Sequence, residues 1–313
     1  MNTATKYRAY CPICGGLGKS FYDIRDAFNG HRFSLQACDS CGLVYTHPFP
    51  SDAMLQAIYA GEYWTREKTT QTLGIIGALV NRFNEIRLAA TVRPLLRRLH
   101  SEAFILEVGC GSGQLAKYLK RKGYGIEVTD INCEILEEIR KSSGIPGYCG
   151  SLEAIEFPHE YDAIIFNNVL EHLPNPRKTL ARAGNLLTSN GFVFAEVPNI
   201  SSIQFRLLRG SWFPLQIPEH LFHFSPGTLQ RLARQAHLRM IWLSTFSPRI
   251  SAAGYPASIF PRLRPEQIRR SWSKKALFLY LSLQTAFFPL ALFEAWLGRG
   301  SAIRAIFTKG YPS

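Results

Sequence analysis

The chain has 313 residues, of which 46% are hydrophobic, so it is long enough to bury a substantial core in one or two domains. Its 36 Lys and Arg against 23 Asp and Glu give a net charge of +13, which suits nucleic acid, an anionic membrane or a phosphorylated substrate. Seven cysteines do not form a complete disulfide set, and the first residues do not resemble a signal peptide. We therefore expect a cytoplasmic protein rather than a secreted disulfide scaffold.

Residues 1–50 contain two CxxC pairs, Cys11 with Cys14 and Cys38 with Cys41. The 23 residues between the pairs allow two turns to converge on one tetrahedral Zn²⁺ ion. Four thiolates leave no open coordination position, so we expect this zinc to be structural. A redox role is disfavoured, because the pairs lack a thioredoxin-like βαβ context. The sequence predicts a zinc ribbon over 1–50.

The other three cysteines, Cys110, Cys133 and Cys149, are interpreted as small core or turn residues. Residues 51–100 are predicted to form a helical linker or cap. Within it, residues 84–99 have helical apolar spacing, which Pro94 is expected to kink or divide.

The apolar run from Ile105 to Val108 ends in Gly109, Gly111 and Gly113, and an amphipathic segment begins at Gln114. This pattern predicts a strand, a glycine turn and a helix. Glycine backbone lets a ligand approach closely, and the first NH groups of the helix face the same crevice. A dinucleotide-binding fingerprint needs a third glycine three residues after the second, where this chain has Gln114.

Further strands are predicted at regular intervals. Residues 125–129 form the next strand, followed by Asp130, which lies 19 residues after Gly111. A carboxylate there can accept hydrogen bonds from ribose hydroxyls, and it can also cap the helix that follows. A third strand precedes residues 151–153, residues 161–173 contain a fourth strand and the loop after it, and a fifth strand covers 191–198.

These motifs resemble those of class I S-adenosylmethionine (SAM) methyltransferases over residues 100–250. Glu107 with the glycine triad resembles their motif I, and residues 169–173, Val-Leu-Glu-His-Leu, resemble the loop after their fourth strand. The resemblance implies a doubly wound, seven-stranded Rossmann-like α/β sheet. It also implies a tyrosine near the cofactor, for which Tyr63 is the candidate. The SAM-binding residues it implies are Glu107, Gly109, Cys110, Gly111, Gly113, Asp130, Ile131, Leu152 and Asn167.

Residues 200–225 form a predicted substrate insertion. Its Glu219-His220-Leu221 resembles a segment of zinc-ribbon methyltransferases that act on nucleotide-linked deoxysugars, other small metabolites or cell-envelope glycans. In the sugar C-methylating members a histidine there removes a proton, which makes His220 the candidate catalytic base. The tyrosine–histidine pair that precedes it in those enzymes is Ile217-Pro218 here, which leaves C-methylation open. His220 as a hydrogen-bonding brace is the alternative, with His172 and His223 as the next candidate bases.

Residues 251–313 are predicted to contain a hydrophobic helical segment and the final strand. Residues 276–297 are almost continuously apolar and match the length of a membrane span. Residues 303–309 resemble the last strand of the methyltransferase sheet, which a single crossing would leave on the wrong side of the membrane. We expect an interfacial helical hairpin bent near Pro289 on the inner membrane face, or else a buried cap or homodimer interface.

The predicted function is methyl transfer from SAM to an oxygen or carbon of a small-molecule or glycan-linked acceptor. The SAM sulfonium is already activated, so the protein mainly positions the acceptor and removes its proton. The fourth strand ends in Phe166-Asn167-Asn168-Val169 and lacks the Asn/Asp-Pro-Pro-Tyr/Phe signature of many nucleobase methyltransferases, which disfavours nucleic acid. The alternatives are a zinc-ribbon methyltransferase that binds RNA and an inactive SAM-fold scaffold at a membrane.

Overall fold

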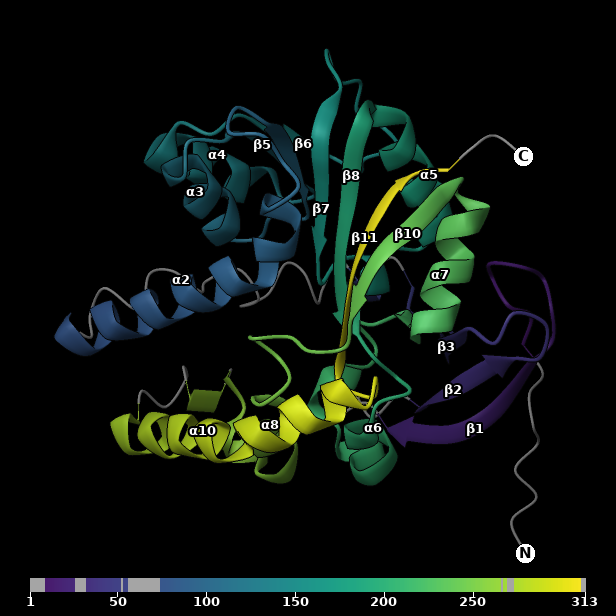
Figure 1. Cartoon of the computed structure of the whole chain (residues 1–313). Coiled ribbons are helices and arrows are strands. Elements are labelled where there is room, and N and C mark those ends of the chain that lie inside the picture. Colours follow the sequence, from purple (N-terminus) through teal and green to yellow (C-terminus); the bar gives the residue numbers. More distant parts are fainter. Residues whose placement is uncertain are drawn as a thin grey trace, which may run out of the picture.

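The computed structural model describes residues 9–25, 32–51, 53–55, 74–265, 267–268 and 273–310. Tyr63, the tyrosine expected near the cofactor, lies outside these residues, as do residues 52 and 56–73 of the predicted linker. Figure 1 shows a central sheet with helices on both faces, a smaller sheet formed near the N-terminus, and a group of helices below.

The central sheet has seven strands in the order β10-β11-β8-β7-β4-β5-β6 (Figure 1). The five strands from β6 to β8 are parallel, and β11 is antiparallel to both of its neighbours. Ile303 of β11 pairs with Val197 of β8, so the final strand lies beside the fifth predicted strand, as expected. The predicted doubly wound α/β fold is confirmed. The strands are β4 Phe104–Val108, β5 Gly125–Asp130, β6 Gly147–Cys149, β7 Tyr161–Asn167, β8 Leu187–Pro198, β10 Leu238–Ser244 and β11 Ala302–Lys309.

Helices cover both faces of this sheet because its strands are apolar on both sides. In β7, Ile164 and Phe166 belong to one buried cluster, whereas Ala163 and Ile165 belong to another. The first cluster packs under α5 (Pro176–Leu186) and α7 (Pro226–Gln235). The second packs under α2 (Gly74–Leu96), α3 (Gln114–Arg121) and α4 (Cys133–Ser143). Pro94 lies in the last turn of α2 and does not divide it.

The N-terminal sheet has the order β1-β2-β3-β9. Its first three strands come from the predicted ribbon and are β1 Gly18–Arg25, β2 Arg32–Cys38 and β3 Val44–His47. The fourth strand, β9 (Phe222–His223), comes from the substrate insertion and pairs antiparallel with β3. Cys11, Cys38 and Tyr45 belong to the same buried cluster as residues of the central sheet. The ribbon therefore packs directly on the methyltransferase core.

Short helices follow the strands. The 3₁₀ turn η3 (Leu170–His172) comes after β7, and the insertion contains α6 (Ile203–Leu208), η4 (Arg209–Ser211) and η5 (Phe213–Leu215). Between β10 and β11 the chain forms α8 (Gly254–Ile259), η6 (Pro261–Leu263) and α10 (Lys274–Trp296).

The predicted hairpin near Pro289 is wrong, because α10 is one continuous helix with Pro289 inside it. A proline removes one backbone hydrogen bond, but reversing the chain also needs turn residues. The sequence from 274 to 296 contains no Gly, Asn or Asp. Only 17% of its most apolar 18-residue window is buried, so α10 is not a core helix of this chain.

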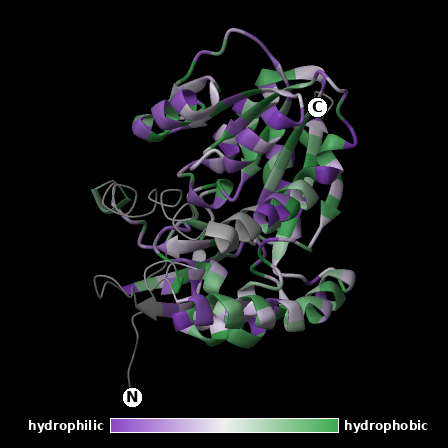
Figure 2. Cartoon of the chain, turned by 90° about the vertical axis from the view of Figure 1, so that its left-hand side faces the viewer, coloured by the Kyte–Doolittle hydropathy of each residue, from purple (hydrophilic) through white to green (hydrophobic). Residues whose placement is uncertain are grey.

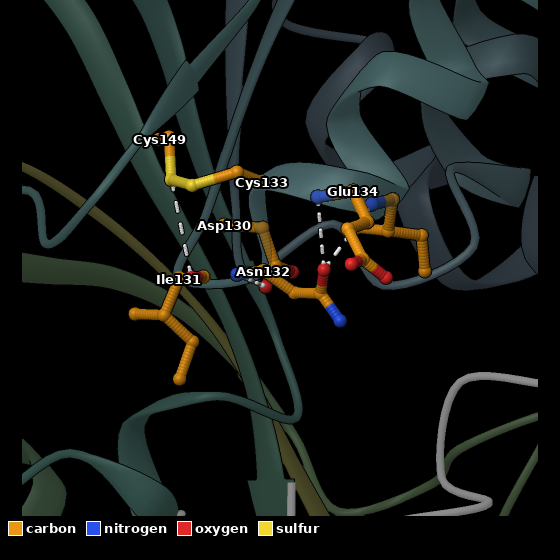
Figure 3. The surroundings of a disulfide bond; sticks show 7 residues. Asp130, Ile131, Asn132, Cys133, Glu134 and Cys149 are labelled. Carbon is orange, nitrogen blue, oxygen red and sulfur yellow. Dashed lines mark hydrogen bonds between the residues drawn. A yellow bond between two sulfur atoms is a disulfide. The ribbon is translucent and has the colours of Figure 1, made fainter. Parts of the chain in front are cut away.

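The expectation that Cys133 and Cys149 are simple core or turn residues is also wrong, because they form a disulfide (Figure 3). Strands β5 and β6 pair at Asp130 and Cys149, and α4 begins directly after β5. This brings the two Cα atoms to 5.1 Å, within the range that a disulfide spans. The two cysteines are 16 residues apart, and only the strand pairing brings them together.

We expect the double variant Cys133→Ala/Cys149→Ala to unfold at lower urea concentration than the oxidised wild type. Closing a loop of this length restricts the unfolded chain and contributes about 3 kcal/mol. A reductant should lower the stability of the wild type by a similar amount and leave that of the double variant unchanged, which is the matched control. Equal stability of oxidised and reduced wild type would contradict the assignment.

Candidate functional site

The glycine turn after β4 has a backbone that other residues rarely adopt. Gly109, Gly111 and Gly113 have φ values of +64°, +51° and +71°. A Cβ atom at Gly109 would lie 2.8 Å from Cγ2 of Val169, and one at Gly113 would lie 2.8 Å from Cδ1 of Ile139. The turn is therefore packed closely against the loop after β7 and against α4. Gly109 and Gly111 are only half-buried, so part of the backbone of the turn is exposed.

Asp130, at the end of β5, lies against this turn. Its Oδ2 accepts a hydrogen bond of 3.1 Å from the NH of Gly111, and its Oδ1 accepts one of 3.0 Å from the NH of Asn132. Burial raises the pKa of this carboxyl, although the backbone donors lower it. The glycine turn and Asp130, which the sequence predicts to lie at the same site, are thus in direct contact in the structure. Each oxygen keeps a lone pair with which to accept a ligand hydroxyl.

Glu107 is the second buried carboxyl at this turn. Burial raises its pKa to about 8. Its Oε2 has no hydrogen-bond partner among the described residues. A buried polar atom without a partner is costly, so this atom fits a donor supplied by a ligand.

The other predicted cofactor residues lie on the same edge of the sheet. Because β4, β5, β6 and β7 are parallel, the loops that follow them meet at one edge. Ile131 is exposed just beyond Asp130 (Figure 3), Leu152 is buried after β6, and Asn167 is half-buried at the end of β7. Cys110 is buried inside the glycine turn. All nine predicted cofactor-binding residues therefore come from the carboxyl ends of four adjacent strands or from the loops after them.

His220 is packed against the loop that follows β7. The NH of Leu221 donates to the carbonyl of Glu171 in η3 at 2.8 Å. Nε2 of His220 lies 4.0 Å from Oε1 of Glu171, and the rings of His220 and His172 are 4.6 Å apart. The predicted base is thus joined, through η3, to the strand that ends at Asn167.

In the Glu171–His172–His220 cluster, Glu171 and His220 are buried and His172 is half-buried. Burial, together with the nearby His172 and His223, holds the pKa of His220 well below its ordinary value. Burial raises the pKa of Glu171 to about 8. Nδ1 of His220 and both carboxyl oxygens of Glu171 have no hydrogen-bond partner among the described residues. One ligand atom from each of the three side chains lies within 4.8 Å of the others, close enough for them to coordinate one cation.

Thr46 of β3 holds the His220 segment from the ribbon side. Its NH donates to the carbonyl of Leu221 at 3.0 Å, and its Oγ1 donates to the carbonyl of His220 at 2.7 Å. The same Oγ1 lies 3.1 Å from Nε2 of His223. Burial lowers the pKa of His223 to about 3. We interpret His223 as a brace because its Nε2 is paired.

Sequence reasoning missed Thr46 and Glu171 as site residues. Thr46 belongs to no motif, and only the pairing of β3 with β9 brings it to His220. Glu171 belongs to the Val-Leu-Glu-His-Leu motif. This motif was used only to locate the fourth strand and the loop after it, and Glu171 was not recognised as a site residue.

The four ribbon cysteines are close together. The Sγ atoms of Cys11 and Cys41 are 3.8 Å apart, those of Cys14 and Cys38 are 3.4 Å apart, and all four lie within 4.8 Å of one another. A tetrahedral zinc with Zn–S bonds of about 2.3 Å places its sulfur atoms at about this separation. Gly15 and Gly42 follow the second cysteine of each pair with φ near +70°, as the turns require. The donor set fits Zn²⁺.

Comparison with known proteins agrees with this geometry. The family model described as a methyltransferase domain matches residues 80–242, more than half of the chain. A ubiquinone biosynthesis O-methyltransferase of Chromobacterium violaceum is 29% identical over 153 residues, which cover 45% of this chain and 66% of that protein. The protein of the same name from Nitrosospira multiformis is 28% identical over 147 residues, 43% of this chain and 62% of its own length. The matches span less than two thirds of these relatives.

A solved structure of similar fold is the Burkholderia thailandensis 1,6-didemethyltoxoflavin-N1-methyltransferase with bound S-adenosylhomocysteine. It aligns with 93% of this chain and 100% of its own, with 14% identity and a TM-score of 0.49. The family match and the strand order lead to one conclusion. The chain belongs to the methyltransferase domain family and has the fold of a class I SAM-dependent methyltransferase.

Proposed function

We propose that this protein transfers the methyl group of SAM to an oxygen atom of a small-molecule acceptor. The observation that supports this best is the contact between the glycine turn and Asp130. The loop that carries Glu171, next to His220, leaves the sheet at the same edge. The name of the bacterial relatives, O-methyltransferase, favours oxygen over carbon as the methylated atom. The glycan-linked acceptor that the sequence resemblance implied gains no support from these relatives.

The residues present fit SAM. We assign Asp130 to the ribose hydroxyls, the glycine turn to the close approach of the ligand, and the unpaired Oε2 of Glu107 to a ligand donor. When bound, SAM supplies a methyl group already activated by its sulfonium. The protein then has to place the acceptor oxygen in line with that methyl group and exclude water.

His220 is our candidate for the group that takes the acceptor's proton. At neutral pH its imidazole is uncharged, because burial lowers its pKa, so it can accept a proton. Nδ1 is the accepting atom, since it has no hydrogen-bond partner among the described residues. The Glu171 carboxyl lies 4.0 Å from the opposite ring nitrogen, Nε2. Only 3% of His220 is exposed, so acceptor binding has to open the insertion around it.

We further propose that the four cysteines hold one structural Zn²⁺. All four positions are thiolates, which leaves no coordination site for an acceptor or an activated water. The metal stabilises the turns that carry β1, β2 and β3, and through β3 it supports the β9 segment that contains His223 and follows His220.

The first functional prediction concerns the cofactor. Asp130→Ala should weaken SAM binding by roughly 5- to 150-fold, which corresponds to about 1–3 kcal/mol for a buried hydrogen-bonding group left without its partner. Isothermal titration calorimetry measures this. Glu138→Ala, which removes an exposed carboxylate from α4, is the matched control and should leave the affinity unchanged. A wild type that gives no heat with SAM, or equal affinity in Asp130→Ala, would contradict the proposal.

The second functional prediction concerns His220. His220→Ala should lower methyl transfer by about 100-fold or more while SAM affinity is preserved, the scale expected for loss of a general base. Transfer of label from methyl-labelled SAM to a bacterial metabolite extract, separated by chromatography, gives the rate. His220→Gln keeps a hydrogen-bonding side chain but no base.

Near-full transfer by His220→Gln would show that His220 is a brace, and the base would then be sought at His172. His223→Gln is the matched control: it should lower stability more than transfer, because His223 is paired with Thr46. In the same assay, label on RNA would favour the RNA-binding alternative. SAM binding without any transfer would favour the inactive scaffold.

The third functional prediction concerns the metal. Elemental analysis should find one zinc per chain, and Cys38→Ser should increase hydrogen exchange in β3 and β9 together, because the two strands share hydrogen bonds. SAM affinity should change little, since the cofactor residues lie on other strands. Cys110→Ser, a change at a cysteine outside the cluster, is the control for zinc content. A metal-free wild type, or exchange that rises in β3 alone, would overturn this account.

A further inference from the structure

Helix α10 is the most exposed long apolar element among the described residues. It spans Lys274–Trp296 and has a mean hydropathy of 1.8 over its most apolar window. Hydrophobic residues, shown in green, follow the helices at the lower edge of the molecule (Figure 2), where Figure 1 places α8 and α10.

The side of α10 that faces the protein is partly polar. Its buried residues are Tyr280, Gln284, Ala291 and Glu294, which recur at helical spacing. The carboxylate of Glu294 accepts hydrogen bonds from the hydroxyl of Tyr255 in α8 and, at 3.3 Å, from Nε2 of Gln204 in α6. These hydrogen bonds fix which side of the helix faces inward.

The outward side is apolar. Phe278 is 74% exposed, Phe293 54% and Trp296 79%. This polarity is the reverse of that of a helix on the surface of a soluble domain, which buries its apolar stripe. An apolar face of this extent marks an interaction surface. The remaining large apolar side chains exposed on it are Leu279, Phe288, Leu290, Leu292 and Leu297.

Cations flank this apolar face at both ends. Lys274 and Lys275 are exposed at its start, and Arg299 is exposed just beyond its end. Arg262 of η6, which packs against α10, is exposed as well. A second copy of this chain would bring like charges together, in addition to its net charge of +13. An anionic surface complements these cations.

The topology determines how α10 can meet such a surface. Ser244 at the end of β10 pairs with Arg304 of β11, so the chain leaves and re-enters the sheet at the same end. Only residues 297–301 separate α10 from β11. If α10 crossed the bilayer once, residues 297–301 would be too short to bring the chain back across it to β11. The helix therefore has to lie in the plane of the interface.

We propose that α10 is an interfacial helix that docks the protein on an anionic lipid bilayer. The apolar face lies among the acyl chains near the headgroups, and the flanking Lys and Arg side chains contact lipid phosphates. Glu294 and Gln204 link this helix to α6, so the docked surface is joined to the insertion that contains His220.

Flotation of the full-length protein with vesicles tests this. We expect the wild type to float with phosphatidylcholine–phosphatidylglycerol vesicles, to float much less with phosphatidylcholine alone, and to be released by high salt. The double variant Phe293→Ser/Trp296→Ser should bind about tenfold more weakly or worse. Ile86→Ser, which alters an exposed aliphatic residue on α2, is the matched control and should float like the wild type. Unchanged SAM binding shows that each variant is folded.

Brominated acyl chains give a second readout. They should quench tryptophan fluorescence in the wild type, and much less in Trp296→Phe, which keeps the apolar face but removes the probe. Failure of the wild type to float at low salt would overturn the proposal. So would sedimentation as a dimer that Phe293→Ser/Trp296→Ser dissociates, since a second copy would then cover the face. Equal flotation of this double variant and the wild type would place the membrane contact elsewhere.

Discussion

The hydrogen bonds between β3 and β9 join the ribbon to the substrate insertion, and the candidate site depends on them. Thr46 binds the carbonyls of His220 and Leu221, while Leu221 in turn donates to Glu171. The His220 segment is therefore held between the ribbon and the loop after β7. Without these hydrogen bonds, residues 217–224 would be a long connection with few fixed contacts. The buried imidazole of His220 would then have no fixed position beside the carboxyl of Glu171.

Patterns over short stretches of sequence were enough to predict much of the fold and part of the candidate site. The apolar run before Gly109 and the alternating strands and helices predicted an α/β sheet, whereas its seven strands and doubly wound arrangement were implied by the resemblance to class I methyltransferases. Asp130 could be paired with Gly111 because both follow adjacent parallel strands. The cysteine spacing similarly predicted the cluster, since two tight CxxC turns leave little freedom in where the four sulfur atoms lie.

Features that depend on contacts between distant segments could not be predicted. The role of Thr46 requires the pairing of β3 with a two-residue strand, β9, that has no periodicity of its own. The disulfide between Cys133 and Cys149 depends on the register of β5 with β6. The inward side of α10 is fixed by Glu294, whose partners Tyr255 and Gln204 lie in other helices. The hairpin was predicted because a single crossing would leave the final strand on the wrong side of the membrane, and Pro289 supplied the expected bend.

Both candidate surfaces of this protein are supported by buried polar groups: Asp130 and Glu107 at the sheet edge, and Glu294 under α10. The central claim is that SAM binds at the sheet edge. Amide hydrogen exchange of the full chain, with and without SAM, tests it most directly. We expect SAM to slow exchange in residues 109–113 and 130–132 and to leave α10 unchanged. Exchange that stays the same at the glycine turn and at Asp130, with protection elsewhere or nowhere, would contradict the account.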